Sequence, residues 1–317
     1  MRVYAWSVDA ASHTPQFVTV EPGVKLEVLD WGGTGRPLVF LAGLGNTAHV
    51  FDSFAPNFVG KYHVYGISRR GFGDSSGPIP NDSNYSSDRL GDDVLAVIEA
   101  LKLQKPVLIG HSIAGEELSS IGSRYPEKVS GLIYLDAGNP YAFYDRAQGD
   151  LQLDLLDTRK QIAQFLPSGP FDNEQDVESL LASLPQLEKD LQNQLKMLNS
   201  IPLPSTKPTA PAPQSFAAIA NAIFNGERKY TEIKVPCLAI FAVPHDASVI
   251  LPTDAAHHDA AVAFKLERTT KLANAFAAGV PSAKVVRLPN ANHYVFRSNE
   301  AEVIHYIDEF LDKLPRP

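Results

Sequence analysis

Residues 105–125 read KPVLIGHSIAGEELSSIGSRY, and this stretch decides the fold. The apolar run 107–109 suits a strand that is buried on both faces. Residues 110–115, GHSIAG, follow at once, and a helical pattern then begins with Glu116 and Glu117 in its first turn, where the helix dipole favours carboxylates. A strand, a sharp turn around a serine and a helix together predict a nucleophile, Ser112, held above the strand ends.

The turn requires small residues on both sides of Ser112, because strand and helix approach each other closely there. Gly110 and Ala114 meet that requirement. The pattern is therefore G-x-S-x-A, with alanine where the usual G-x-S-x-G has its second glycine. We expect the one extra methyl group to be tolerated.

The composition excludes several classes of protein. With 317 residues, 44% of them hydrophobic, the chain can form one large α/β domain or a core with an insertion. A net charge of −8 argues against a nucleic-acid or anionic-membrane partner. The single cysteine, Cys237, cannot form an internal disulfide, and its apolar neighbours predict a buried core residue.

Localisation and membrane association are inferred from two absent patterns. The N-terminus lacks the basic and apolar regions of a signal peptide, so we expect a cytoplasmic protein. The sequence contains no apolar run of 18 residues, so we expect no membrane span. The sequence makes no prediction about the oligomeric state.

Strand and helix patterns alternate along most of the chain. A helix is expected from Ser87, its predicted N-cap, to Leu101. Such alternation predicts a mostly parallel sheet flanked by helices. Strand patterns stop near residue 138 and resume after 230, so we predict a core of residues 1–138 and 231–317 and an inserted helical cap, residues 139–230. The predicted strands lie within 17–20, 25–31, 37–41, 62–67, 107–109, 131–135, 236–243 and 284–288.

A serine hydroxyl is a weak nucleophile until a base removes its proton, so Ser112 needs a histidine that is oriented by an acid. In a parallel sheet these partners come from loops at the carboxyl ends of later strands. Asp246 follows the strand at 236–243 and His293 follows the strand at 284–288, which gives the chain order serine, aspartate, histidine. Asp136, directly after the strand at 131–135, is the competing acid, and His245 is expected to point away.

The chain resembles an α/β-hydrolase-fold enzyme over nearly its whole length. The matching segments are LVFLAGLG (38–45), RRGFGDSS (69–76), GHSIAG (110–115), RYPEKVSGLIYLD (124–136), the loop of Asp246 and ANHYVF (291–296). The resemblance implies that Ser112 is the nucleophile, His293 the general base and Asp246 its orienting acid. It also implies an oxyanion hole from the backbone N–H groups of Leu44 and Ile113. Ala42 departs from the family, which commonly has a histidine there, and this changes the support of the loop more than the hole itself.

Further residues are candidates for substrate binding. Gly43 leaves room for backbone to approach a bound carbonyl, and His111 lies within the serine turn. Tyr141, Phe143 and Tyr144 begin the predicted cap and are candidate pocket walls, although packing of cap against core is an equally good interpretation. No cofactor is expected. No metal is expected either, because the adjacent side chains of the tract 257–259 (HHD) cannot converge on one ion.

Hydrolysis of a small carboxylic ester is the favoured function, by analogy with the family. Peptidase, thioesterase, lactonase and carbon–carbon hydrolase chemistry use the same triad and remain open. Dehalogenases and epoxide hydrolases are disfavoured, because relatives of those types have aspartate at the position of Ser112. A non-catalytic ligand receptor is a further alternative.

An NADP-dependent oxidoreductase is the remaining alternative. Gly43, Gly45 and Ala48 fit the dinucleotide pattern G-x-G-x-x-A after a strand, and Arg69 and Arg70 follow the next strand, where a 2′-phosphate could bind. Burial of the two arginines in ion pairs is the alternative expectation.

Overall fold

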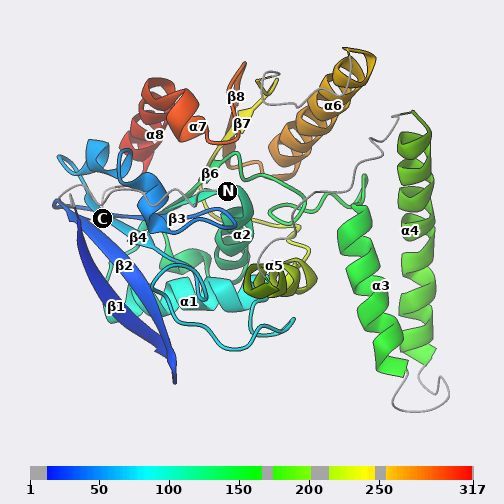
Figure 1. Ribbon diagram of the computed structural model, residues 1–317, viewed down its shortest axis with the longest axis horizontal. Coiled ribbons are helices and arrows are strands. Elements are labelled where there is room, and N and C mark those ends of the chain that lie inside the picture. The colour runs from blue at the N-terminus through cyan, green and yellow to red at the C-terminus, as the bar shows by residue number, and fades with distance from the viewer. Residues whose placement is uncertain (1–12, 166–173, 201–213, 247–254, 316–317) are drawn as a thin grey trace.

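An eight-stranded sheet forms the centre of the protein, shown by a computed structural model that describes residues 13–165, 174–200, 214–246 and 255–315 (Figure 1). The strand order is β1-β2-β4-β3-β5-β6-β7-β8. The pairs β1–β2 and β2–β4 are antiparallel, and all the other neighbouring strands are parallel. The strands are β1 (Thr14–Glu21), β2 (Val24–Gly32), β3 (Pro37–Leu41), β4 (His63–Ile67), β5 (Val107–His111), β6 (Gly131–Leu135), β7 (Cys237–Ala242) and β8 (Ala283–Leu288).

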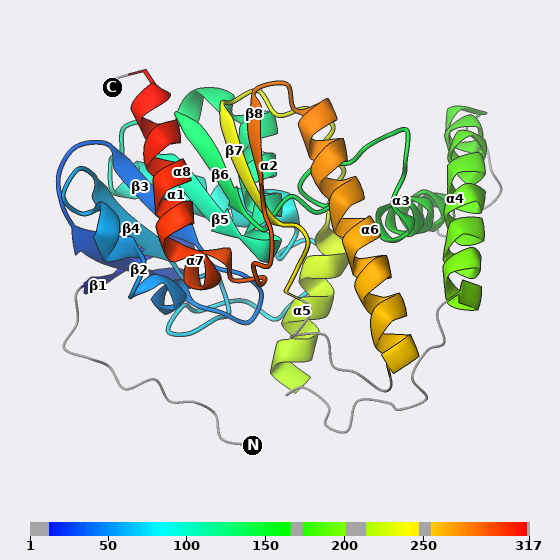
Figure 2. The same ribbon diagram turned by 90° about the horizontal axis from the view of Figure 1, so that it is seen from above.

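Helices cover both faces of this sheet (Figure 2). The α-helices are α1 (Ser87–Ala100), α2 (Gly115–Arg124), α3 (Leu151–Phe165), α4 (Glu174–Ser200), α5 (Gln214–Gly226), α6 (Ala255–Gly279), α7 (Val295–Ser298) and α8 (Glu300–Lys313). Four short 3₁₀-helices are η1 (Ala48–Phe51), η2 (Ala55–Phe58), η3 (Ser112–Ala114) and η4 (Pro126–Lys128).

Alternate residues of the parallel strands enter two separate cores. In β7, Ala239 lies in the core beneath α1, α2 and α6, whereas Leu238 and Ile240 lie in the core beneath η1, η2, α7 and α8. A strand covered on both faces must be apolar at every position, which explains the uninterrupted apolar runs in the sequence. The predicted α/β architecture is confirmed, and Cys237 is a buried core residue.

The sheet topology places a site at one edge. Strand β3 pairs with β4 on one side and with β5 on the other, so the winding direction reverses between β3 and β5. Ligands of open α/β sheets bind at the carboxyl ends of strands beside such a reversal. The loops after β3 and β5 meet there, and the loops after β6, β7 and β8 leave the same edge.

Helices α3, α4 and α5 lie between β6 and β7 in the chain. Figure 1 shows α3 and α4 side by side and away from the sheet, whereas α5 lies near the start of α1. The Ser87 hydroxyl donates to the Gly226 carbonyl at 3.5 Å, which joins the end of α5 to α1. This arrangement agrees with a helical cap, and its boundaries at residues 139 and 230 stay a prediction. No helix in the described ranges has both the length and the apolarity to cross a bilayer.

The start of α1 differs by one residue from the prediction. Ser86 is the N-cap: its backbone is extended, with φ −65° and ψ 153°, and its hydroxyl accepts a hydrogen bond from the Arg89 N–H at 3.3 Å. Ser87, the predicted cap, is buried and donates to Glu116 Oε2 at 3.0 Å. Either serine fits the sequence pattern, and the contact with α2 decides between them.

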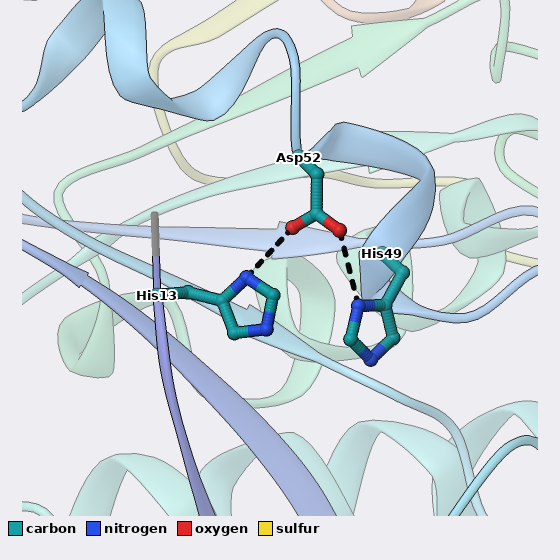
Figure 3. A group of neighbouring side chains, drawn as sticks. All are labelled: His13, His49 and Asp52. Atoms are coloured by element: carbon teal, nitrogen blue, oxygen red, sulfur yellow. Dashed lines mark hydrogen bonds and ion pairs between the residues drawn. The ribbon is translucent and has the colours of Figure 1, made fainter. Parts of the chain in front are cut away.

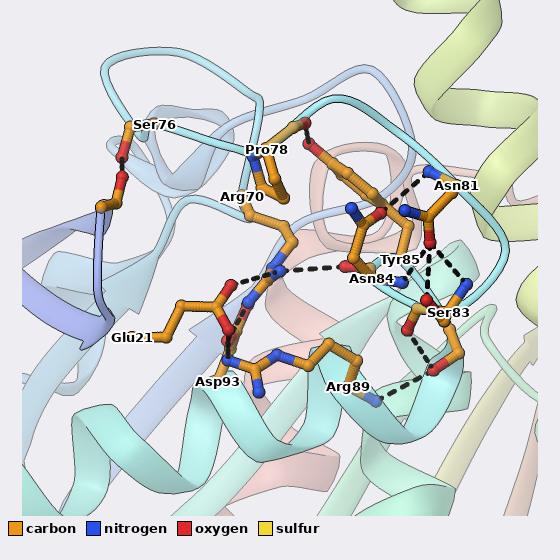
Figure 4. A network of polar contacts seen from close by, with 12 residues as sticks. Glu21, Arg70, Ser76, Pro78, Asn81, Ser83, Asn84, Tyr85, Arg89 and Asp93 are labelled. Carbon is orange, nitrogen blue, oxygen red and sulfur yellow. Dashed lines mark hydrogen bonds and ion pairs between the residues drawn. The ribbon is translucent and has the colours of Figure 1, made fainter.

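Arg70 forms a buried ion pair beside α1 (Figure 4). Its Nε and Nη2 donate to the two carboxylate oxygens of Asp93, each at 2.6 Å, and Nη1 lies 2.9 Å from Glu21 Oε1. Burial raises the pKa of Asp93 even though the arginine opposes that shift. The expectation that Arg70 is buried in an ion pair is therefore confirmed.

Arg70→Met is expected to lower the free energy of unfolding by about 3–5 kcal/mol, because it leaves the buried Asp93 carboxylate without its cation. Urea denaturation measures the effect. Lys313→Met is the control: Lys313 pairs with Glu309 at the surface, and its loss is expected to cost at most about 0.5 kcal/mol. Equal effects of the two substitutions would contradict the structural role of Arg70.

Candidate active site

Ser112 stands on a strained turn between β5 and α2. Its φ is +55°, a left-handed conformation that residues other than glycine rarely adopt. A Cβ placed on Gly115 would lie 2.0 Å from the Ala137 carbonyl oxygen, and one on Gly110 would lie 2.9 Å from Leu118 Cδ1. The backbone therefore packs too closely for larger side chains at these positions. Ala114 is fully buried, so the G-x-S-x-A variant of the pattern fits without a gap.

Asp136 is the carboxylate that contacts the His293 ring. Its Oδ2 lies 2.7 Å from His293 Nδ1. The expectation that Asp246 occupies this place is corrected: the structure pairs the histidine with the acid at the end of β6, not with the acid after β7. The predicted competitor, Asp136, has the geometry of an orienting acid.

The backbone after β7 determines which side chain of this loop reaches the site. His245 forms an isolated bridge with Ala291, and the Asp246 N–H donates to the Ala291 carbonyl at 2.9 Å. Neighbouring side chains of extended backbone point to opposite sides. It is His245 that reaches Asp136, with Nε2 at 3.4 Å from Oδ2, and the expectation that it points away is wrong.

The surroundings of Asp136 favour its ionised form. Burial alone raises the pKa of this carboxyl, but contacts from His245 and His293 outweigh burial and bring the pKa to about 2. Its other oxygen, Oδ1, accepts a hydrogen bond from the Ala242 N–H at 3.0 Å. The carboxylate is therefore charged at neutral pH and fixed in position against the imidazole.

His111, a predicted substrate-binding residue, instead supports the catalytic histidine candidate. Its Nε2 lies 3.0 Å from the His293 carbonyl oxygen, which can only accept, so Nε2 carries the proton. The rings of His111 and His293 lie 4.6 Å apart between centroids. Burial, followed by the charge of His293, lowers the pKa of His111 to about 3, so the ring is neutral.

These contacts bring His293 beside the serine turn. His111 precedes Ser112 directly, so the contact between the two histidines places the loop after β8 against the loop after β5. Within the described residues, no hydrogen bond joins the Ser112 hydroxyl to the His293 ring. Such bonds are often long without substrate and tighten when it binds. The side chain of His293 is 42% exposed, so the ring is accessible from solvent.

The loop after β3 passes against the serine turn. A Cβ on Gly43 would lie 3.2 Å from Ser112 Cβ and 2.8 Å from His111 Nδ1, so only glycine fits at this approach. Leu44 and Ile113, the predicted oxyanion-hole residues, pack in one apolar cluster. Their N–H groups as donors to an oxyanion stay a prediction.

The same apolar cluster joins the serine turn to α5. Phe216 and Ile223 of α5 pack in it together with Ile113, and so does Tyr141. A Cβ on Gly45 would lie 3.4 Å from the Phe216 ring. Tyr141 is therefore positioned beside the candidate site, and Phe216 is a neighbour that the sequence analysis did not single out.

The other two predicted wall residues pack elsewhere. The Phe143 ring lies 6.0 Å from that of Phe276 in α6, and the Tyr144 hydroxyl donates to Asp154 at 2.7 Å. Both line a groove of about 620 Å³ that contains no residue of the serine turn. Phe143 therefore packs against α6 and Tyr144 bonds to α3, and a role of either residue as a pocket wall stays a prediction.

Buried carboxylates lie behind the serine turn at the start of α2. Glu117 accepts two hydrogen bonds from Arg69, at 2.6 and 2.9 Å, which confirms the expected ion pair. Burial, then the charges of Glu117 and Glu227, raise the pKa of Glu116 well above its usual value. The raised pKa favours the neutral form of Glu116, which limits negative charge beside a helix N-terminus that could stabilise an oxyanion.

The loop of Gly43 and Gly45 does not have the structure of a dinucleotide-binding site. The loop of Gly43 and Gly45 leads into the four-residue 3₁₀-helix η1, not into the α-helix whose N-terminus would bind a pyrophosphate. Arg69 and Arg70 are buried in their ion pairs, so neither is available to a 2′-phosphate.

Comparisons with known proteins agree with this architecture. Residues 36–229, more than half of the chain, match the family described as alpha/beta hydrolase fold. The bifunctional esterase/perhydrolase DCH of Acinetobacter calcoaceticus is 30% identical over 167 residues, which cover 49% of this chain and 59% of that protein. Epoxide hydrolase 4 of Homo sapiens is 30% identical over 130 residues, which cover 39% of this chain and 34% of that protein. The chain thus spans less than two thirds of these curated relatives.

Solved structures extend the similarity to the whole chain. A thermophilic esterase from Thermogutta terrifontis superposes with a TM-score of 0.56 at 20% sequence identity, over 96% of this chain and 99% of that one. At this identity the likeness describes the fold alone.

Proposed function

The chain belongs to the alpha/beta hydrolase fold family, and from that premise we propose that it is a serine hydrolase that cleaves carboxylic esters through an acyl-enzyme intermediate. The observation that carries the proposal is the placement of Ser112 on a left-handed turn beside a histidine that is bonded to a buried carboxylate. A nucleophile, a base and an orienting acid are the three parts that this chemistry requires.

In the proposed first step the Ser112 oxygen attacks the ester carbonyl, and His293 Nε2 takes the hydroxyl proton. The resulting imidazolium is stabilised by Asp136, which accepts the hydrogen bond from Nδ1–H. The N–H groups of Leu44 and Ile113 are proposed to donate to the negatively charged oxygen of the tetrahedral intermediate. His293 then protonates the leaving alcohol, and the acyl group stays on Ser112.

In the second step His293 removes a proton from water, which attacks the acyl-enzyme and releases the acid. The partial exposure of the His293 ring allows water to reach it. Asp136 keeps Oδ2 against Nδ1 through both steps, because the Ala242 N–H binds the other oxygen, Oδ1, and His245 contacts Oδ2.

The serine distinguishes this proposal from the chemistry named for some relatives. Epoxide hydrolases and a fluoroacetate dehalogenase are among the similar proteins. By family resemblance such enzymes have aspartate at the nucleophile position, and this chain has Ser112. Thioester, lactone, peptide and carbon–carbon bond cleavage require the same three residues and differ only in the pocket, so a substrate panel has to separate them.

A panel of aryl and alkyl esters, varied separately in acyl and alcohol size, tests the proposal against thioesters, lactones, an epoxide and fluoroacetate. We expect the highest kcat/KM with an ester, and no turnover of the epoxide or fluoroacetate. Preferential turnover of a non-ester substrate would contradict ester hydrolysis while leaving the triad in place. Absence of turnover with every substrate would favour a receptor.

A further inference from the structure

His13, His49 and Asp52 converge beside the first strand (Figure 3). His13 directly precedes β1, His49 lies in η1 and Asp52 is the residue that caps η1. Each offers one ligand atom, and these atoms all lie within 4.8 Å of one another. Two imidazole nitrogens and a carboxylate are a donor set that suits Zn²⁺ and related divalent ions.

The His13 ring is buried and is not satisfied by hydrogen bonds. Its side chain is 7% exposed, and Nδ1 lies 2.9 Å from Asp52 Oδ1. Despite this short distance, neither atom has a hydrogen-bond partner, because the angles do not fit a hydrogen bond. A buried nitrogen and a buried oxygen that approach without a proton between them leave both atoms unsatisfied, and a shared cation would satisfy both.

The second histidine is held in the orientation of a metal ligand. His49 Nδ1 lies 3.0 Å from Asp52 Oδ2, and its Nε2 lies 3.4 Å from Glu27 Oε1. Glu27 is 3% exposed, and its other oxygen accepts a hydrogen bond from the Ser68 hydroxyl at 2.6 Å. Histidines that bind metals commonly donate their second ring N–H to a carboxylate, which leaves the first nitrogen as a lone-pair donor.

A hydrogen bond from His49 to the Glu27 carboxylate requires the ring proton on Nε2. With the proton on Nε2, both Nδ1 of His49 and Oδ2 of Asp52 are acceptors, and they face each other. His49 meets Asp52 either with its single proton on Nδ1, which then donates to Oδ2, or with its Nδ1 lone pair, in which case the two acceptors share a cation. The unsatisfied His13 nitrogen on the other oxygen of Asp52 favours the cation, because one ion can serve all three residues.

We propose that His13, His49 and Asp52 bind one divalent transition-metal ion, for which Zn²⁺ is the best match, and that Glu27 orients His49. Ligand atoms about 2.0–2.2 Å from a tetrahedral zinc lie roughly 3.2–3.6 Å from each other, so binding requires only small side-chain rotations. The ion joins the start of β1 to η1, which follows the loop of Gly43 and Gly45. The site braces this region and takes no part in the proposed ester cleavage.

No metal is expected from the sequence, where the candidate tract is 257–259; the side chains of His257 and His258 lie outside the described ones. The three residues proposed here are brought together by β1 and η1. A similar pair in the protein is His63 and Asp30: His63 Nε2 lies 2.9 Å from Asp30 Oδ1, and among the described residues no second histidine completes a metal-ligand group there. The pair of His63 and Asp30 is a matched control for His13 and Asp52, because it has the same two residue types and the same distance of 2.9 Å between the histidine nitrogen and the aspartate oxygen.

Metal content and thermal unfolding of the full, untagged chain test the proposal. The protein is treated with chelator, equilibrated with Zn²⁺ at pH 7.5 and passed over a desalting column. We expect about one zinc per chain and, at a free zinc concentration about 100-fold above the dissociation constant, a rise in Tm of roughly 5 °C. His13→Gln, His49→Gln and Asp52→Asn should each weaken zinc binding at least about tenfold, whereas Glu27→Gln should weaken it less.

His63→Gln and the double substitution His257→Gln, His258→Gln should keep one zinc per chain. The proposal is overturned if wild type retains no zinc, or if His13→Gln, His49→Gln and Asp52→Asn all retain as much as wild type. It is also overturned if the 257/258 substitution removes the ion. Circular dichroism of each chelated variant confirms that loss of zinc is not loss of fold, and three independent ligand variants keep the test valid if one of them does not fold.

Discussion

Ser112→Ala is expected to lower kcat for a short-chain aryl ester by about 10⁴–10⁶-fold, because it removes the atom that attacks the carbonyl. The substitution should leave the fold intact. Alanine removes one hydroxyl from a side chain that is only half-buried and that no other described residue binds through a hydrogen bond. Alanine does retain the strained positive φ, so the turn is not relieved as it would be by glycine. Steady-state kinetics and circular dichroism of the same preparation measure both quantities.

Ser123→Ala is the matched control for this experiment. Ser123 lies in α2, the helix that follows the serine turn, and its hydroxyl donates to the Glu232 carbonyl rather than facing the site. Its kcat should stay within about twofold of wild type. A folded Ser112→Ala variant that retains more than about a tenth of the wild-type kcat would remove Ser112 from the mechanism.

Asp136→Asn is expected to lower kcat by about 10⁴-fold at pH 7, whereas Asp246→Asn should lower it less than about tenfold. The carboxylate of Asp136 accepts from His293 Nδ1 and stabilises the imidazolium, and an amide at this place favours the wrong tautomer. The same change at position 246 leaves that hydrogen bond in place. Kinetics of the two variants on one ester, measured side by side, give the comparison.

The separate effects of Asp136→Asn on kcat, on KM and on the amount of folded enzyme distinguish a positioning role from a structural one. If Asp136 orients the histidine, its replacement should lower kcat much more than it changes KM, because the interaction develops in the transition state. A purely structural role would instead lower the amount of folded enzyme and leave kcat per folded molecule unchanged. A larger loss of kcat in Asp246→Asn than in Asp136→Asn would restore the acid that the sequence analysis preferred.

The strands of the sheet could be predicted well, because the signal for each strand lies in its own residues. Buried parallel strands must be apolar at every position, so runs such as that of β6 are visible without any tertiary contact. The serine turn was equally visible, because the close approach of β5 and α2 requires small residues such as Gly110 and Ala114 on both sides of Ser112. The one-residue shift of the cap of α1 shows where local information ends: Ser86 and Ser87 are both good caps, and a contact with Glu116 in another helix decides between them.

The choice of acid could not be predicted from the same kind of information. Asp136 and Asp246 both follow apolar strands at the same edge of the sheet, and chain order favours Asp246. His293 pairs with Asp136, and in the segment that bridges to Ala291 it is His245 that contacts this carboxylate. A shift of one position exchanges His245 and Asp246, and no composition or spacing reports that shift.

Two of the candidate pocket walls, Phe143 and Tyr144, pack elsewhere for a related reason. Tyr141, Phe143 and Tyr144 are close in sequence, yet only Tyr141 packs in the apolar cluster beside Ile113. Phe143 packs against α6, and Tyr144 bonds to Asp154. Phe216, from the cap helix α5, was not predicted because its approach to Gly45 joins segments far apart in the chain.

The account depends most on a covalent intermediate at one side chain. Rapid acid quenching during turnover of an aryl ester, followed by peptide mass spectrometry, detects that intermediate directly. We predict an acyl group on Ser112 in wild type, much less of it in His293→Ala, and none in Ser112→Ala. An ester that is turned over with the acyl group on another residue, or with an aspartate carboxyl oxygen exchanged from isotopically labelled water, would contradict the proposed mechanism.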